Sequence, residues 1–256
     1  MIVDIQSIIE TGRQVWKIIK IGNILKRFRF IWNYYFSTPA KLLVLGESGT
    51  GKTQFINSIL SKIPITSHRT RLGKENVLVY KNGKKVVFID LPGHKTLYPE
   101  RKKYIDNIRK KKITGIINVV NYGYNESDTA QDLSIFKVGT NDVKEEYLKE
   151  NRKREIAQIE EWKKEITFDC KLKLIITIVY KADIWYKQSD EVLNYYEKGE
   201  YAKQLESLGN IACHCFPYCS IIEPFYNRPM IIEMGEQKKT ELHNILTKEF
   251  LSVLFN

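Results

Sequence analysis

Residues 46–53 carry the most specific chemical pattern in this chain, the run Gly46-Glu47-Ser48-Gly49-Thr50-Gly51-Lys52-Thr53. The spacing Gly-x-x-x-x-Gly-Lys-Thr is typical of a phosphate-binding loop, whose glycines let successive backbone N–H groups converge on phosphate oxygens. Lys52 would bring its ammonium group to the terminal phosphates, and the Thr53 hydroxyl would bind Mg²⁺. We therefore predict that the chain binds a nucleoside triphosphate.

A second group of residues with chemical potential, Asp90-Leu91-Pro92-Gly93-His94, follows the apolar run 86–89. A carboxylate at the carboxyl end of a strand stands where α/β folds place ligand groups, so Asp90 could hold Mg²⁺ through water. The Gly93 N–H could bond the γ-phosphate, and His94 could orient the attacking water. Asp-x-x-Gly is a weak pattern alone, and it gains weight from its position downstream of the phosphate loop.

Regular elements must position these two motifs. An apolar strand over 41–45 precedes the phosphate loop and a helical pattern over 54–60 follows it, which is the context that such a loop requires. The apolar runs 76–80 and 86–90 flank Asn82-Gly83. An Asn-Gly pair between two apolar runs predicts a hairpin, because both turn positions need positive φ.

Further elements alternate along the rest of the chain. We expect strands over 113–121, 172–180 and 211–220, helices over 98–112, 144–166, 189–208 and 236–254, and polar irregular segments over 63–75 and 122–143. Strands that alternate with helices around a phosphate loop predict an α/β fold. Its sheet would be mostly parallel and six-stranded, with one antiparallel hairpin strand and helices on both faces.

Together these motifs resemble those of a small GTPase domain of the translation-factor-related class, the group that includes Ras, Era and elongation factor Tu. Residues 46–53 match the first family motif, and Asp90-Leu91-Pro92-Gly93 matches the third. Tyr180-Lys181-Ala182-Asp183 is similar to the fourth motif, Asn/Thr-Lys-x-Asp, and Ser220 falls where the family has its Ser-Ala loop. The second motif is a single threonine, assigned here to Thr70 with Thr66 as the alternative. The resemblance covers roughly residues 40–255.

The resemblance implies a role for each matching residue. Lys52 and the amides of 46–51 would hold the phosphates, and Thr53, Thr70 and Asp90 would form the Mg²⁺ site. Asp183 would accept hydrogen bonds from the guanine N1–H and 2-amino group, which adenine lacks. The Lys181 stem would stack on the base, and the backbone at Ser220-Ile221 would read the guanine oxygen. His94 would orient the attacking water, so the expected function is a GTP-binding protein that hydrolyses GTP to GDP as a molecular switch.

Three residues depart from the family pattern. Tyr180 replaces an Asn or Thr whose side chain ties the base loop to the phosphate loop, and a tyrosine cannot reproduce that amide bonding. Ile221 replaces the alanine of the Ser-Ala loop, although its backbone N–H survives the substitution. Gly49 stands where potassium-assisted Era-like members carry Asn. The change at Tyr180 leaves a P-loop ATPase as an alternative.

Other chemistry has weaker support. A non-catalytic module that recruits proteins or membranes in a nucleotide-dependent way is a second alternative to the GTPase. Cys213, Cys215 and Cys219 would share one side of an extended strand, but a zinc finger-like site requires paired ligands on turns. The basic helix 98–112 could bind RNA, although a lysine-rich helix is usually a solvated face and no aromatic RNA-binding motif accompanies it.

The composition of the chain indicates which kinds of binding partner and which cellular compartment to expect. The net charge of +11 favours an anionic partner, which could be nucleic acid, an acidic protein or an anionic membrane surface. The resemblance to a switch protein separately implies an effector protein. The four cysteines do not form the pattern of a disulfide framework, so we expect a reduced, cytoplasmic setting. The absence of a run of about 18 uncharged apolar residues predicts no transmembrane helix. We expect two parts, an amphipathic segment over 1–38 and a G domain over 39–256.

The N-terminal segment generates a testable prediction. Apolar residues recur at helical spacing, basic residues outnumber acidic ones, and Trp16 and Trp32 are present. Such a helix ordinarily packs against a core, but it can also lie on an anionic membrane. On the membrane hypothesis, the full-length protein should co-sediment with anionic vesicles in a salt-sensitive manner, and a protein starting at Thr38 should not. Equal sedimentation of the two proteins would favour packing.

Overall fold

The computed structural model describes residues 38–60, 74–79, 84–91, 113–126, 133–166, 172, 174–223, 225–227 and 234–255. Contacts within the chain divide it into two units, one of residues 1–39 and 77–87 and one of residues 40–76 and 88–256. The larger unit contains every residue predicted for the nucleotide site. The N-terminal segment 1–37, the predicted helix 98–112 and the Asn82-Gly83 turn lie outside the described residues.

Six strands form one sheet in the order β2-β3-β1-β4-β5-β6. Their bounds are β1 Ala40–Leu45, β2 Lys74–Val79, β3 Lys85–Asp90, β4 Gly115–Val120, β5 Leu174–Val179 and β6 Ala212–Pro217. The pairs β1·β4, β4·β5 and β5·β6 are parallel. Only residues 80–84 join β2 to its neighbour β3, and so short a connection can join antiparallel strands but not parallel ones. The predicted sheet, with its single antiparallel pair, is therefore confirmed.

The central strands explain why this sheet forms. Every residue of β4 and of β5 is buried, as expected for continuous apolar runs that are covered on both faces. In the parallel register Asn118 of β4 lies opposite Leu45 of β1 and Thr177 of β5. The carboxyl ends of these strands therefore meet at one edge of the sheet, and the loops that follow them are brought together there.

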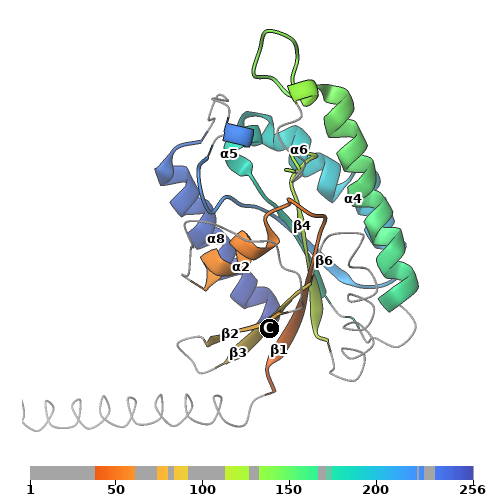
Figure 1. The fold of residues 1–256 in the computed structure, drawn as a ribbon. Helices are drawn as coiled ribbons and strands as arrows, with labels where there is room; N and C mark the ends of the chain where they lie inside the picture. The colour runs from red at the N-terminus through yellow and green to blue at the C-terminus, as the bar shows by residue number, and fades with distance from the viewer. Residues whose placement is uncertain are drawn as a thin grey trace, which may run out of the picture. The chain divides into compact units, whose positions relative to one another are not determined.

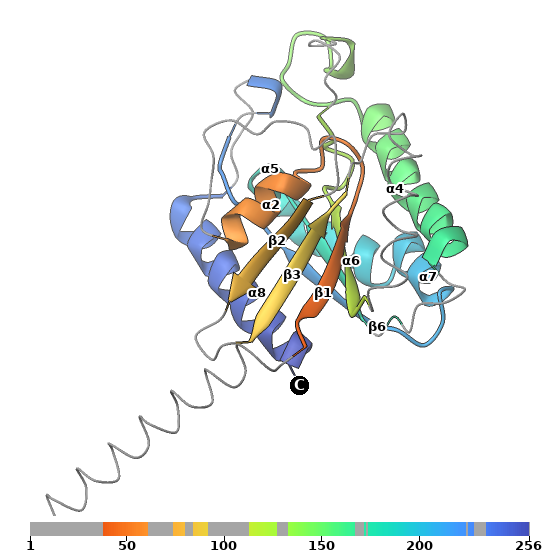
Figure 2. The ribbon, with the colours of Figure 1, turned by 60° about the horizontal axis from the view of Figure 1, so that its bottom comes forward.

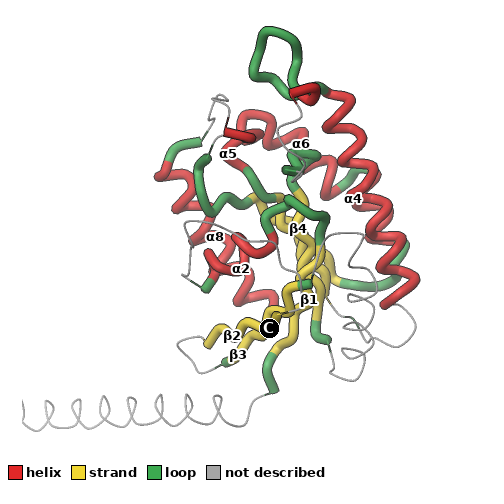
Figure 3. Tube along the Cα trace, viewed as in Figure 1, coloured by secondary structure: helices red, strands yellow, loops and turns green. Residues whose placement is uncertain are grey.

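Helices flank both faces of the sheet. In Figures 1 and 2, α2 (Lys52–Ile59) and α8 (Glu236–Phe255) lie on one side, whereas α4 (Glu145–Ile166), α6 (Ser189–Glu197) and α7 (Glu200–Glu206) lie on the other. Phe88 of β3 stacks on Phe250 of α8 with ring centroids 5.9 Å apart, which fixes the last helix to the sheet. A short helix, α5 (Ala182–Trp185), and three 3-10 turns, Leu133–Ile135, Tyr186–Gln188 and Phe225–Asn227, complete the described elements (Figure 3).

Most observed bounds lie within two residues of the predicted ones, and three differences have a clear structural content. The helix predicted over 189–208 is divided into α6 and α7, because the N–H groups of Lys198 and Gly199 both bond to Asn194 O and end the first helix. β6 ends at Pro217 rather than at Ser220. Lys74 and Glu75 belong to β2 rather than to the polar loop predicted over 63–75, of which 63–73 lies outside the described residues.

Within the described part of the chain, no helix combines the length and the apolar character needed to cross a membrane.

Candidate nucleotide-binding site

The phosphate loop turns between β1 and α2, with Lys52 as the first residue of the helix. The Lys52 ammonium donates hydrogen bonds to Gly46 O at 3.0 Å and to Glu47 O at 2.7 Å, so it lies over the loop and is only 8% exposed. The Thr50 hydroxyl donates to Glu47 O at 2.9 Å and braces the turn. Because the N-terminus of α2 follows directly, the positive end of its helix dipole favours an anion at this loop.

Thr53 and Asp90 join the first motif to the third. The Thr53 hydroxyl donates to Asp90 Oδ2 at 3.0 Å, although the two residues are 37 positions apart in the sequence. Asp90 is the last residue of β3 and is 2% exposed. A hydroxyl that donates its hydrogen to a carboxylate still has acceptor lone pairs, and Mg²⁺ prefers oxygen ligands of this kind. The donor set therefore fits the Mg²⁺ site that the sequence predicts.

Two glycines of the phosphate loop allow neighbouring segments to approach closely. A Cβ atom at Gly49 would lie 1.9 Å from Glu126 O, and one at Gly51 would lie 2.4 Å from a ring carbon of Tyr180. Both glycines also have positive φ, 78° and 90°. No residue type with a side chain could meet both conditions at these positions. The packing around the loop therefore requires these glycines, as does its conformation.

Tyr180 links the base loop to its surroundings in a way that the sequence did not predict. Its hydroxyl donates to Gln54 Oε1 of α2 at 3.3 Å and shares a hydrogen bond with Ser220 Oγ. Burial raises the pKa of Tyr180 well above its ordinary value, so the hydroxyl stays protonated at neutral pH. The tyrosine cannot reproduce the amide bonding expected at this position, but its hydroxyl and ring provide another connection between the same two loops.

The base loop and the loop after β6 lie together. Asp183 is 2% exposed, its Oδ1 accepts from the Cys219 thiol at 3.3 Å, and its Oδ2 accepts from the Glu223 N–H at 3.4 Å. Burial raises the pKa of the Asp183 carboxyl, and these two hydrogen bonds oppose that shift. Ala182 N–H donates to Tyr218 O at 3.2 Å. Lys181, Asp183, Ser220 and Ile221 are thus brought to one region by these two loops.

Several predicted residues lie outside the described part of the chain. They are Thr70 with its alternative Thr66, Gly93 and His94.

The three cysteines near β6 do not share one side of a strand as predicted. Cys219 lies beyond the end of β6 and is buried, whereas Cys213 is exposed. Among the described residues, no group of three or more His, Cys, Asp or Glu side chains could hold a metal ion.

The sequence did not predict the role of the segment Asn121–Glu126, which follows β4 and contacts the phosphate loop. Asn125 Nδ2 donates to Glu47 Oε2 at 2.9 Å, and Glu126 N–H donates to Gly49 O at 3.5 Å. The Glu126 carboxylate also pairs with Lys181 Nζ at 3.2 Å. The only signal in the sequence is its location, since a polar segment directly after a buried parallel strand must lie at the ligand-binding edge of the sheet.

A buried carboxylate on α4 holds this segment in place. Glu155 is 2% exposed, and its Oε1 accepts from the N–H groups of Asn121 at 3.2 Å and Gly123 at 3.3 Å. Its Oε2 accepts from the Tyr196 hydroxyl at 2.6 Å. Burial raises the pKa of the Glu155 carboxyl to about 7, although these three hydrogen bonds lower it.

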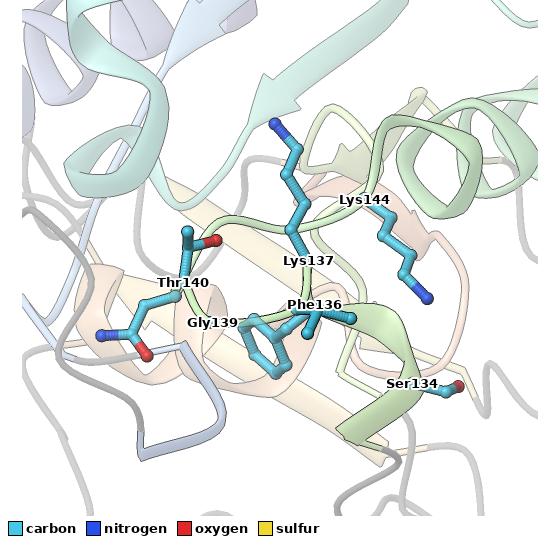
Figure 4. A pocket seen from close by; sticks show the side chains of 8 residues that line it. Ser134, Phe136, Lys137, Gly139, Thr140 and Lys144 are labelled. Carbon is cyan, nitrogen blue, oxygen red and sulfur yellow. The ribbon is translucent and has the colours of Figure 1, made fainter.

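A cavity of about 420 Å³ lies elsewhere, in the loop between the first 3-10 turn and α4 (Figure 4). The strand-like bridge between Phe136 and Val143 closes the base of this loop. The cavity shares no residue with the predicted site and is lined by Ser134, Phe136, Lys137, Val138, Gly139, Thr140, Asn141 and Lys144.

The raised pKa of Glu155 predicts pH-dependent stability. In the unfolded chain this carboxyl loses its proton near 4.5, but in the folded protein it keeps the proton up to about 7. The folded state therefore binds more protons between these values, and the contribution of Glu155 to the free energy of unfolding falls by about 3 kcal/mol as the pH rises through them. Glu155→Gln is neutral at every pH and keeps an oxygen that can accept from both amides.

Urea unfolding of the parent and of Glu155→Gln should therefore diverge between pH 4.5 and about pH 7, with the variant gaining relative stability as the pH rises. Glu150→Gln is a matched control, because Glu150 is exposed on the same helix and pairs with the exposed Arg154. Parallel pH profiles for the parent and Glu155→Gln would contradict the assignment.

One of three comparisons with known proteins places the chain in a family. One solved structure, the mammalian SRP receptor, is similar over 70% of this chain and 91% of that chain, with 14% identity and a TM-score of 0.44. The comparison with curated proteins found no match. The family model described as "50S ribosome-binding GTPase" matches residues 41–181, which is more than half of the chain. The chain belongs to this family of phosphate-loop GTPases and is a GTP-binding protein.

Proposed function

We propose that this protein hydrolyses GTP to GDP in a Mg²⁺-dependent reaction and acts as a molecular switch. The observation that carries the proposal is the hydrogen bond between Thr53 and Asp90, 3.0 Å long, together with the buried Lys52 ammonium over the phosphate loop. It supports the proposal because phosphoryl transfer depends on positioning and electrostatic stabilisation rather than on covalent chemistry by the protein. Thr53, Asp90 and Lys52 supply the hydroxyl, the carboxylate and the ammonium group that such positioning and stabilisation would use.

Thr53 and Asp90 would hold Mg²⁺, with Thr70 as the further proposed ligand. Bound there, Mg²⁺ would supply positive charge that offsets the negative charge of the phosphates. Asp90 orients the Thr53 hydroxyl by accepting its hydrogen, as neighbouring groups commonly orient metal ligands. Lys52 would leave the carbonyl oxygens of Gly46 and Glu47 and pair with the terminal phosphates, so GTP would replace two neutral acceptors with charged ones.

Residues on two loops would select guanine. We propose that Asp183 accepts from the N1–H and 2-amino group, that the Lys181 stem stacks on the ring, and that the backbone at Ser220-Ile221 reads the guanine oxygen. Asp183 is buried, so a base without the two donors would leave a carboxylate poorly paired. The Cys219 thiol and the Glu223 N–H donate to Asp183 in the present structure. When guanine binds, its two donors would replace them.

The switch would depend on segments near the γ-phosphate. We propose that the segments containing Thr70 and His94 become ordered with GTP and relax after hydrolysis, so that an effector protein meets different surfaces in the two states. His94 would orient the attacking water, and the loop amides with Lys52 would stabilise the charge that develops on the γ-phosphate.

Base selectivity is the first test of this proposal. GDP should bind at least about tenfold more tightly than ADP, a difference of about 1.4 kcal/mol, as measured by calorimetry. Asp183→Asn should shift the preference toward xanthosine diphosphate, because an amide can donate where the carboxylate only accepts. Equal affinities of the parent for GDP and ADP would contradict guanine selection and would favour an ATPase.

Catalysis by His94 is the second test. His94→Ala should lower single-turnover GTP hydrolysis about 10- to 1000-fold with nearly constant nucleotide affinity, the pattern expected for a group that is needed only in the transition state. Lys52→Ala should instead weaken nucleotide binding itself. An unchanged hydrolysis rate in His94→Ala would remove this residue from the mechanism, and hydrolysis that persists in Lys52→Ala would point to a contaminating enzyme.

A further inference from the structure

Glu126 contacts both loops that the nucleotide would occupy. Its N–H donates to Gly49 O of the phosphate loop at 3.5 Å, and its Oε1 lies 3.2 Å from Lys181 Nζ of the base loop. The same Oε1 accepts from the Tyr226 N–H at 3.4 Å. The carboxylate is therefore fixed by a backbone donor on one side and by the ammonium group on the other.

Lys181 is held at both ends of the residue, at its backbone and at its ammonium group. Its backbone adopts a left-handed conformation with φ of 58°, directly before α5. Its ammonium group lies 4.8 Å from the centroid of the Phe225 ring, a cation–π distance, in addition to its pairing with Glu126. Only 9% of the side chain is exposed. A lysine on the surface samples many rotamers, and burial with these two contacts favours the arrangement seen here.

We propose that Glu126 is a positioning residue for the guanine base, because its carboxylate holds the Lys181 side chain where the base will stack. This inference rests on the proposed role of Lys181 in base recognition. Fixing a long side chain before the ligand arrives removes an entropic cost that binding would otherwise incur. The same pairing compensates the charge of an ammonium group that is largely buried.

Because a second carboxylate, that of Glu223, also attracts Lys181, Glu126 would decide which way the Lys181 side chain points as well as keep it ordered. Glu223 is half-buried and interacts electrostatically with both Lys181 and Glu126. Burial raises the pKa of the Glu223 carboxyl, and the negative charge of Glu126 raises it further. When Glu126 loses its charge, Lys181 should turn toward Glu223 or toward water, and its stem should leave the stacking position.

Glu126→Gln tests the charge pair alone, because the glutamine oxygen can still accept from Tyr226 N–H. GDP affinity should fall about 3- to 10-fold, the range expected when one long side chain must be ordered on binding. Competition by inorganic pyrophosphate, which probes the phosphate loop without a base, should be unchanged. Glu126→Asp should lie between the parent and Glu126→Gln, because it keeps the charge with a shorter reach.

A double-mutant cycle with Lys181→Met separates positioning from a general structural role. In the Lys181→Met background, Glu126→Gln should have little further effect on GDP affinity, because the group that Glu126 positions is already absent. The matched control Glu150→Gln removes a carboxylate from an exposed ion pair with Arg154 and should not change GDP affinity. Thermal unfolding of each variant checks that it is folded.

The outcomes distinguish this inference from the proposed function on which it rests. If Lys181→Met leaves GDP affinity unchanged, the base-recognition role of Lys181 is wrong. If Lys181→Met weakens GDP binding but Glu126→Gln does not weaken it, or strengthens it, the positioning role of Glu126 is wrong. Loss of GDP and pyrophosphate binding together, or loss of folding in both Glu126→Gln and Glu126→Asp, would show that Glu126 is structural.

Discussion

The nucleotide site depends on positions in the phosphate loop where no side chain can stand, Gly49 and Gly51 among them. Glu126 O occupies the space beside Gly49, and the Tyr180 ring occupies the space beside Gly51. This close approach is possible because β1, β4 and β5 are parallel and neighbouring, so their carboxyl ends deliver three loops to one edge of the sheet. The contacts that define the site, from Asn125 to Glu47 and from Glu126 to Lys181, follow from that convergence.

Much of the fold could be predicted because its elements carry strong local patterns. The continuous apolar runs of β4 and β5 are buried on both faces, and the alternation of strands with helices around a phosphate loop is typical of a mostly parallel sheet. The predicted end of β6 was wrong because apolar character indicates that a residue is buried, not that it belongs to a strand. Tyr218 and Cys219 are buried, but they lie in the loop beyond the strand.

The candidate site was predictable only where its residues form motifs. A hydrogen bond joins Thr53 to Asp90, and Asp183 contacts Cys219 next to Ser220, whereas Thr70 and His94 lie outside the described residues. The roles of all these residues stay predictions. The contacts of Glu126 and Glu155 could not be read from local sequence, since Glu155 bonds to Gly123 across 32 positions and the Glu126 pairing depends on where two strands end. Tyr180 is a similar case. From the sequence, replacing the family's Asn or Thr by tyrosine predicts that a hydrogen bond between the base loop and the phosphate loop is lost. It does not predict the hydroxyl contacts to Gln54 and Ser220 that are formed instead.

The Mg²⁺ dependence of single-turnover GTP hydrolysis tests the central claim most directly, in the parent, Thr53→Ser and Thr53→Ala. The account predicts that hydrolysis in the parent requires Mg²⁺ and saturates with it. Thr53→Ser keeps the hydroxyl and should behave similarly, whereas Thr53→Ala should require about 10- to 100-fold more Mg²⁺, since it loses the hydroxyl that Asp90 orients. The account would be contradicted if the parent did not hydrolyse GTP at any Mg²⁺ concentration, or if Thr53→Ala had the Mg²⁺ requirement of the parent.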